Sequence, residues 1–270
     1  MSRVEGERSG FYRRAVQRLL DEGVLGREMR VVVTCGGRLD RDVLHGLGFA
    51  DVTITNLDER IEEEFAPYPW RREDAESLSF ADSSFDWGIV AAGLHHCRSP
   101  HRALLELYRV ARTGILGIES RDSMAMRAAI RAGLVDEYEI GAVAAHGLAA
   151  GGVANTSVPN YVYRWTEREV EKTVASYAPH ARHRFLYERE LELPETVLGS
   201  TRGLRSTALR ALTPVARGVA RVLPAQANLF AFAVVKEGGL QPWLRQGEQG
   251  PQPDPDWVRE RYAVGPQAER

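Results

Sequence analysis

The order of hydrophobic and polar positions predicts a chain of alternating strands and helices. Apolar residues recur at helical spacing over residues 9–22, and three consecutive valines within residues 29–33 indicate a strand that is buried on both faces. The same pattern predicts helices at 40–47 and 101–110, a short helix or turn at 61–65, and strands at 52–57, 70–73, 85–91 and 115–119. This alternation is typical of an α/β fold with a parallel sheet, helices on both faces and right-handed crossovers.

The pattern changes after Ser120. Residues 121–160 are rich in Ala and Gly and carry no strand signal, so we expect an inserted region of helices and loops. Regular elements return as a helix at 166–177, an outer strand at 183–193, a helical segment at 200–223 and a last strand at 229–235. Thr166 and Glu169 form a capping-box pattern at the start of the first of these helices. We expect one domain over residues 1–237 and a weakly ordered tail at 238–270. Within the domain, an N-terminal helix lies in 1–28, and insertions at 121–165 and 195–224 form a cap.

Composition narrows the class of protein. With 270 residues, 44% hydrophobic and 27% charged, the chain has the usage of an ordinary globular protein, which excludes wholesale disorder. A net charge of −2 gives no support for a nucleic-acid partner. The two cysteines cannot build a disulfide framework or a zinc site, so we expect no metal and a reducing, cytoplasmic location. No stretch approaches 18 uncharged apolar residues, and therefore no membrane-spanning segment is expected.

Candidate ligand-binding residues follow the first two predicted strands. In an open parallel sheet, ligands bind beyond the carboxyl ends of the strands, and the first strand ends in Thr34-Cys35-Gly36-Gly37. These glycines allow close approach of a ligand to the backbone, or they serve only a tight turn. The second strand ends in Asn56-Leu57-Asp58, where either polar side chain can accept hydrogen bonds from a ribose diol; capping of the next helix is the alternative for Asp58.

A longer motif follows. Residues 72–120 read REDAESLSFADSSFDWGIVAAGLHHCRSPHRALLELYRVARTGILGIES. The stretch resembles class I S-adenosylmethionine-dependent methyltransferases, and it is most similar to the small-molecule branch that carries a DA-x-x-L-x-F-x-D-x-S-F-D segment and an LHH after the fourth strand. The resemblance covers residues 29–120, and more loosely the last two strands to 236. It implies a doubly wound, seven-stranded, mostly parallel sheet whose last strand lies antiparallel beside the fifth.

The resemblance also implies a donor site for S-adenosylmethionine. It places Asp74 and Ala75 beside the adenine, Asn56 or Asp58 at the ribose, and the turn residues Cys35, Gly36 and Gly37 at the methionine. Ala91, at the end of the fourth strand, is counted with the donor contacts. The first strand lacks the acidic residue that is usual in this family, and we expect Asp40 or Asp42 to compensate for it. A nucleoside-binding regulatory protein that has lost catalysis is the alternative that this departure leaves open.

His95 and His96 are the predicted catalytic residues. They lie at the position where the family transfers the methyl group. A histidine there can remove the proton of an acceptor hydroxyl, or orient the acceptor. The structural alternative is that one of the two only caps the following helix or bonds a backbone carbonyl.

The acceptor is expected to meet the inserted regions. Residues 155–165 combine amide, hydroxyl and aromatic side chains, which suits a sugar-like or secondary-metabolite acceptor, although a plain structural loop is equally compatible. Tyr12, Asn160 and Tyr161 are the candidate substrate contacts, whereas His146 reads as a loop histidine. Arginines interleave with apolar residues between 202 and 222, which is compatible with peripheral contact to an anionic membrane and a lipid-linked acceptor, or simply with a solvated face. The sequence indicates neither the identity of the acceptor nor the oligomeric state.

Overall fold

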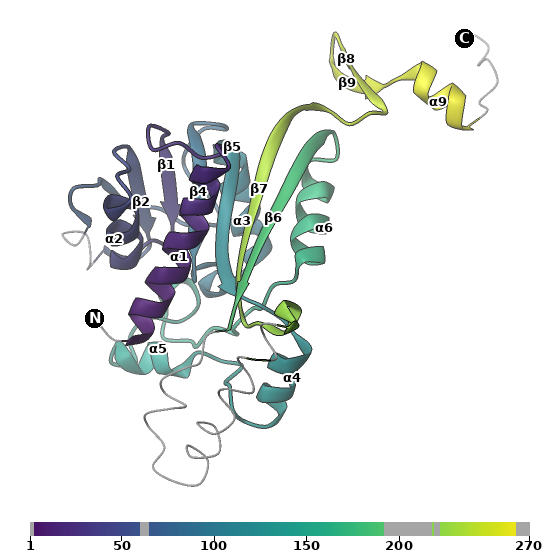
Figure 1. Ribbon diagram of the computed structural model, residues 1–270. Coiled ribbons are helices and arrows are strands. Elements are labelled where there is room, and N and C mark those ends of the chain that lie inside the picture. Colours follow the sequence, from purple (N-terminus) through teal and green to yellow (C-terminus); the bar gives the residue numbers. More distant parts are fainter. Residues whose placement is uncertain (1–2, 60–64, 192–217, 219–221, 263–270) are drawn as a thin grey trace.

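A seven-stranded sheet forms the centre of the computed structural model, which describes residues 3–59, 65–191, 218 and 222–262 (Figure 1). The strand order is β3-β2-β1-β4-β5-β7-β6, and β7 runs antiparallel to both of its neighbours while the other pairs are parallel. The strands are β1 (Val31–Thr34), β2 (Val52–Asn56), β3 (Trp70–Arg72), β4 (Phe85–Ala91), β5 (Ala111–Ser120), β6 (Ala181–Glu190) and β7 (Leu229–Leu240). The predicted α/β class and the reversed last strand are confirmed.

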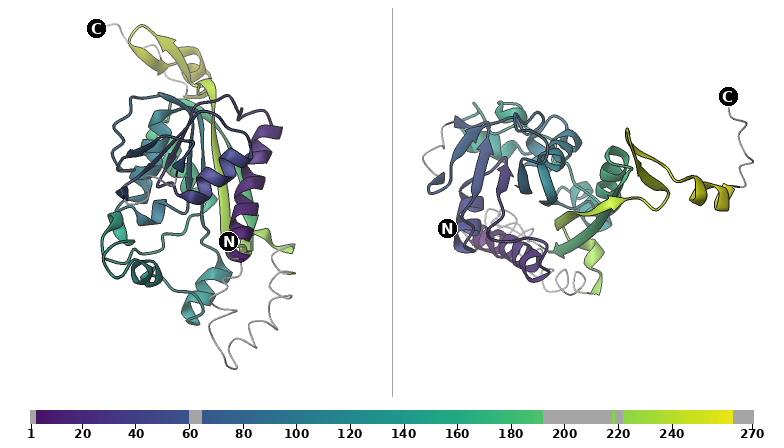
Figure 2. Two further views of the ribbon diagram at one scale, coloured as in Figure 1. Left: turned by 90° about the vertical axis from the view of Figure 1, so that its left-hand side faces the viewer. Right: turned by 90° about the horizontal axis from the view of Figure 1, so that it is seen from above.

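Helices cover both faces of this sheet (Figures 1 and 2). Helices α1 (Arg3–Asp21) and α2 (Arg38–Gly46) pack on one face, and α3 (Pro100–Val110) and α6 (Glu167–Tyr177) on the other. The described residues also form α4 (Met124–Arg131), α5 (Ile140–Ala145) and α9 (Pro255–Tyr262), and the short 3-10 turns η2 (Leu94–His96), η3 (Val153–Asn155) and η4 (Pro224–Gln226). The first helix begins earlier than predicted because its first two turns are mostly polar and give no hydrophobic period. Thr166 caps α6 as predicted, since its side chain accepts a hydrogen bond from the Glu169 amide.

Burial follows the alternation of side chains along each strand. All four residues of β1 are buried, with Val31 and Val33 in the core beneath α1 and α2, and Val32 in the core beneath α3 and α6. The three valines therefore serve two separate cores, which confirms that this strand is buried on both faces.

The inserted region forms α4, α5 and η3 and lies beyond the carboxyl ends of the parallel strands (Figures 1 and 2). It is joined to the sheet by a bridge between Arg121 and Trp165, and an ion pair of 2.8 Å links Arg121 to Glu167 at the start of α6. Within it, the backbone around Tyr138 pairs with that around Tyr161. The predicted helical and loop insertion is confirmed, and it covers the sheet edge where ligands bind.

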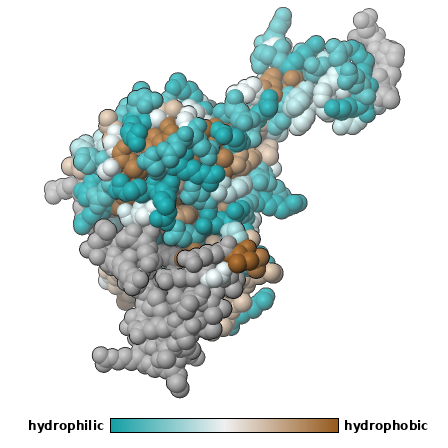
Figure 3. Space-filling view, in the orientation of Figure 1, coloured by the Kyte–Doolittle hydropathy of each residue, from teal (hydrophilic) through white to brown (hydrophobic). Residues whose placement is uncertain are grey.

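The chain after Gly238 differs from the predicted weakly ordered tail. Strand β7 continues to Leu240, β8 (Leu244–Gly247) pairs with β9 (Gly250–Pro253), and α9 follows as part of an arm that extends away from the sheet (Figure 2). Apolar contacts explain this order, because the rings of Trp243 and Trp257 lie 6.0 Å apart within a stretch whose composition is otherwise polar. Most of the arm's visible surface is hydrophilic (Figure 3).

Two predicted segments fall on parts of the chain that the structure leaves undescribed. These are the short helix at 61–65, of which only Phe65 is described, and nearly all of the helical segment at 200–223. Within the described ranges, no helix combines the length and the apolar character that a bilayer crossing requires.

Candidate active site

A cavity of about 300 Å³ opens at the carboxyl ends of β1, β2 and β4, and the insertion forms its opposite wall. Six of the predicted site residues line it: Cys35, Asn56, Asp58, Asp74, Ala75 and His96. The insertion contributes the other wall through Ala142, His146, Gly151, Gly152, Ala154 and Asn155. The cavity therefore joins the predicted donor residues, one predicted catalytic histidine and the inserted region.

Hydrogen bonds fix the wall that the strands provide. The Asn56 amide nitrogen donates to the Gly36 carbonyl at 2.8 Å, and the Asn56 amide oxygen accepts from the backbone of Asp58 at 3.0 Å. Both ends of the Asn56 side chain are thus engaged in holding the two loops together. Asn56 and Asp58 both line the cavity, so both remain candidates for the ribose.

The loop after β3 is fixed in the same manner. Asp74 Oδ1 accepts from the Glu76 backbone at 2.9 Å, which closes a tight turn. The Glu76 carboxylate accepts from the backbone of Arg98 and Ser99, immediately before α3, at 3.1 and 2.7 Å. Asp74 and Ala75 therefore face the cavity from a loop that is tied to the start of a helix.

The glycine turn after β1 has a structural role. A Cβ on Gly36 would lie 2.6 Å from Ile54 Cγ2, and the Gly37 amide donates to Asp40 Oδ2 at 2.8 Å where α2 begins. Gly36, Gly37, Asp40 and Ala91 are not among the residues that line the cavity. The expected direct contact of these four with the donor does not fit this placement, because packing and helix capping use them instead.

Asp40 and Tyr12 are buried together away from the cavity. Asp40 is 4% exposed, and burial raises the pKa of its carboxyl to about 6. Burial and the nearby Asp40 carboxylate likewise raise the pKa of Tyr12. Tyr12 was expected to contact the substrate. It lies on α1, and its side chain is buried in the core between that helix and the sheet, which does not fit that role.

Cys35 and Cys97 both line the cavity. Cys35 has a left-handed backbone with φ 53°, and a Cβ on Gly93 would lie 2.4 Å from Cys35 Cβ, so only glycine fits opposite this turn. A hydrogen bond to the Cys35 side chain, together with burial, raises the pKa of the Cys97 thiol. Both cysteines are free thiols, in agreement with the prediction.

A buried glutamate holds the first histidine. Glu119, near the carboxyl end of β5, is 1% exposed, and its Oε1 accepts from the backbone amides of Gly93 and Leu94 at 2.9 and 2.8 Å. Its Oε2 lies 2.8 Å from His95 Nδ1. Burial lowers the pKa of His95, but the opposing charge of Glu119 outweighs it and raises the pKa to about 10.

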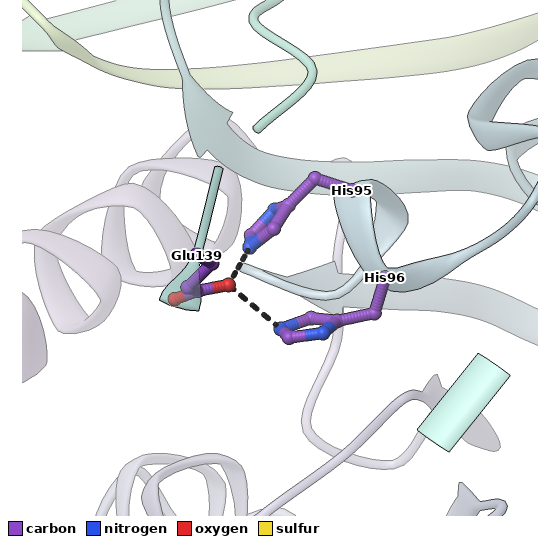
Figure 4. A group of neighbouring side chains, drawn as sticks. All are labelled: His95, His96 and Glu139. Carbon is purple, nitrogen blue, oxygen red and sulfur yellow. Dashed lines mark ion pairs between the residues drawn. The ribbon is translucent and has the colours of Figure 1, made fainter. Parts of the chain in front are cut away.

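Glu139 brings the two histidines together. Its Oε2 lies 3.4 Å from His95 Nε2 and 3.3 Å from His96 Nε2, and the three side chains point toward one another (Figure 4). Burial and the neighbouring His95 lower the pKa of His96, whose side chain is 31% exposed. Burial raises the pKa of Glu139, but its bond to His95 outweighs this and holds the value at about 2.

The predicted acceptor contacts lie around this cluster. Asn160 is 2% exposed; its side-chain nitrogen donates to Glu139 Oε2 at 3.2 Å, and its backbone carbonyl accepts from the Glu139 amide at 3.0 Å. Tyr161 is half exposed and packs on Tyr138, with 5.5 Å between ring centroids. Neither lines the cavity, so Asn160 positions Glu139 and Tyr161 stabilises the insertion.

Sequence reasoning missed Glu119, Glu139 and the contribution of His146. Glu119 carried a usable signal, since an acidic residue near the end of a buried parallel strand lies at the edge where ligands bind. Glu139 lies in a segment without recognisable periodicity, where only the folded backbone brings it to the histidines. His146, interpreted as a loop residue, lines the cavity with its Nδ1 2.8 Å from the Ala142 carbonyl.

Comparisons with known proteins concern the domain and the fold. Residues 32–117 match a family model described as a methyltransferase domain. The YcgJ protein from Bacillus subtilis has 15% sequence identity and a TM-score of 0.51, with 84% of this chain and 99% of that chain covered. A SAM-dependent methyltransferase from Archaeoglobus fulgidus has 11% identity and a TM-score of 0.51, with 84% and 94% covered. A search of curated proteins found no match.

The chain therefore carries a methyltransferase domain on a Rossmann-like, seven-stranded sheet. The family match covers residues 32–117, and the two solved structures share the fold of the chain around it.

Proposed function

We propose that this enzyme transfers the methyl group of S-adenosylmethionine to a hydroxyl of a small, sugar-like or secondary-metabolite acceptor. The observation that carries the proposal is the single cavity that joins the strand-end carboxylates to His96 and to the insertion.

The side chains along the strand-side wall suit the donor. A ribose diol needs hydrogen-bond acceptors, which Asp58 provides, and an adenine amino group needs an acceptor, which Asp74 provides beside the small Ala75. The sulfonium end lies toward Cys35 and Gly93, where the close backbone contact leaves no bulky side chain. A sulfonium methyl group is already activated, and so the protein's main task is to hold the acceptor in line with it.

His96 is the histidine that reaches the acceptor. It lines the cavity, whereas His95 is held on one side by Glu119 and faces Glu139 on the other. In the transfer, the carbon–sulfur bond breaks, a carbon–oxygen bond forms, and the hydroxyl proton leaves toward His96. His95 is a positioning residue, because Glu119 fixes its ring and its place fixes Glu139.

The insertion supplies the rest of the acceptor wall. His146 and Asn155 face the cavity together with small residues of α5 and the following loop. Polar groups next to open space suit a small acceptor with several hydroxyl groups, which they can hydrogen-bond.

Calorimetry with S-adenosylhomocysteine tests the donor half, and a panel of sugars and phenols assayed for S-adenosylhomocysteine release tests the acceptor half. We expect binding at micromolar to sub-millimolar donor product and turnover with hydroxyl acceptors. The absence of both heat and thermal shift at millimolar ligand would refute donor binding. Turnover confined to nitrogen or carbon acceptors would refute the hydroxyl assignment.

A further inference from the structure

The cluster of His95, His96 and Glu139 has the composition of a metal centre. Each side chain offers one ligand atom, and the three atoms lie within 4.8 Å of one another. The two histidines come from the turn after β4 and the carboxylate comes from the insertion, as Figure 4 shows. Two imidazoles and one carboxylate form a recurrent ligand set for catalytic transition-metal ions.

The spacing of these atoms fits a small ion. Two ligands that each lie about 2.0–2.1 Å from a tetrahedral zinc ion are about 3.3–3.4 Å apart. The distances from Glu139 Oε2 to the two Nε2 atoms are 3.4 and 3.3 Å. An ion between the carboxylate and either imidazole therefore requires little movement of the carboxylate, and all three ligand atoms lie within 4.8 Å of one another.

The surrounding hydrogen bonds are those that a metal centre needs. Glu119 engages Nδ1 of His95, which leaves Nε2 of that ring as the ligand atom, and two backbone amides hold Glu119 itself. Asn160 donates to Glu139 and fixes the orientation of its carboxylate. Such outer partners orient the ligands and increase their affinity for the ion.

The charges also favour a divalent cation. Glu119 is 1% exposed and the Glu139 side chain is 37% exposed, and together they bring two negative charges close to two imidazoles. Without an ion, the proton on His95 compensates this charge; a bound divalent cation would replace that proton and leave both imidazoles neutral as ligands.

We propose that His95, His96 and Glu139 bind one divalent transition-metal ion of the zinc type, with a remaining coordination position directed toward the cavity beside His96. Nitrogen ligands select zinc, cobalt or nickel over magnesium, which prefers oxygen ligands. The role in catalysis rests on the proposed function: with the ion bound, Nε2 of His96 is a ligand, the ion would lower the pKa of an acceptor hydroxyl in the open position, and the proton would leave to solvent instead of to His96. The binding itself does not depend on that function.

Metal binding is tested with Zn²⁺ alone on the full chain after chelation, by calorimetry and thermal unfolding. We expect one ion per chain, a raised Tm, and no comparable effect of Mg²⁺. Substitution of Co²⁺ should give an absorption spectrum of a site with nitrogen and oxygen ligands. Glu139→Gln and His96→Ala should weaken Zn²⁺ binding at least about 100-fold, and Asn160→Ala about 10-fold. His146→Ala, which removes a histidine from the same cavity but not from the cluster, should leave Zn²⁺ affinity unchanged.

Absence of Zn²⁺ binding at millimolar concentration, equal binding of Mg²⁺, or unchanged affinity in both cluster variants would overturn the proposal. Each variant is also titrated with S-adenosylhomocysteine, whose binding shows that the variant is folded. If the wild type binds the donor product and turns over but does not bind Zn²⁺, the metal centre alone is overturned. Normal Zn²⁺ binding without donor binding overturns the proposed function alone.

Discussion

The two walls of the cavity are built in different ways. On the strand side, Asn56 ties the first two strand-end loops together, and Glu76 ties the loop after β3 to the start of α3. On the insertion side, the wall depends on a short backbone pairing around Tyr138 and Tyr161 and on turns near Gly152. The wall at which we propose that the donor binds thus belongs to the sheet itself, whereas the wall proposed for the acceptor is an addition to it. Donor recognition and acceptor choice can therefore change independently.

Glu119→Ala has the largest expected effect, because Glu119 lies where the two walls meet. The change leaves two backbone amides unsatisfied and His95 without its partner. Removal of one member of a buried ion pair costs about 3–5 kcal/mol in the free energy of unfolding. We also expect turnover to fall by about 100-fold or more.

Urea unfolding and S-adenosylhomocysteine release measure these two effects. Glu190→Ala, on the exposed end of β6, is the control for loss of a glutamate and should cost less than about 1 kcal/mol. A stability loss in Glu119→Ala no greater than that of the control would show that Glu119 does not link the walls.

A pair of variants separates the walls directly. Asp58→Ala should weaken S-adenosylhomocysteine binding by about 10- to 100-fold, because hydrogen bonds to a charged acceptor contribute about 1.5–3 kcal/mol. His146→Ala should leave that affinity within about twofold and raise the KM for the acceptor instead, because His146 belongs to the insertion. Calorimetry and initial rates measure the two quantities. If both variants changed both quantities equally, the two walls would act as one unit.

The sequence was informative for the strand side and much less so for the insertion. Alternating valines and the motif from Asp74 to Asp86 reflect contacts within the sheet and α3, such as the bond from the Arg30 amide to Asp86 at 2.8 Å. The valine run has the pattern of a buried strand, so the sheet could be predicted from the residues themselves, whereas the donor loops were predicted from the resemblance to a known family. Glu139 is placed beside the histidines by backbone pairing: its amide donates to the Asn160 carbonyl, and the Val162 amide donates to the Glu137 carbonyl. Such a pairing produces no periodic pattern in the sequence that could have predicted it. For the glycines after β1 the sequence left a ligand contact and a tight turn open, and the packing of Gly36 against Ile54 on the next strand accords with the second.

Gly152→Ala tests how far the insertion wall depends on local turns. A Cβ at this position would lie 1.9 Å from the Val158 carbonyl oxygen, so the backbone of the wall must shift. We expect the acceptor KM to rise about tenfold while donor affinity stays unchanged. Gly141→Ala in α5 is the matched control: no atom lies within 4 Å of its added Cβ, and alanine favours the helix by about 1 kcal/mol. Equal KM values in the two variants would contradict a wall held by this turn.

The smallest effect is expected for Asp40→Asn, which concerns the rigidity of the strand side alone. The pKa of Asp40 is about 6 in the folded protein against an ordinary value of 3.8, so the folded state holds a proton that the unfolded chain has released between about pH 4 and 6. Stability from this group is therefore fully present below pH 4 and is lost as the pH rises through 6. Asparagine carries no charge to desolvate, and its side-chain oxygen can still accept the hydrogen bond from the Gly37 amide. Asp40→Asn should therefore be more stable than the wild type by about 1 kcal/mol at pH 7.5, and this difference should disappear near pH 4. Urea unfolding at the two pH values measures this difference. Asp42→Asn removes a carboxylate that is exposed on the same helix and is the control. Equal stability changes in the two variants at both pH values would mean that burial of the Asp40 charge does not cost stability.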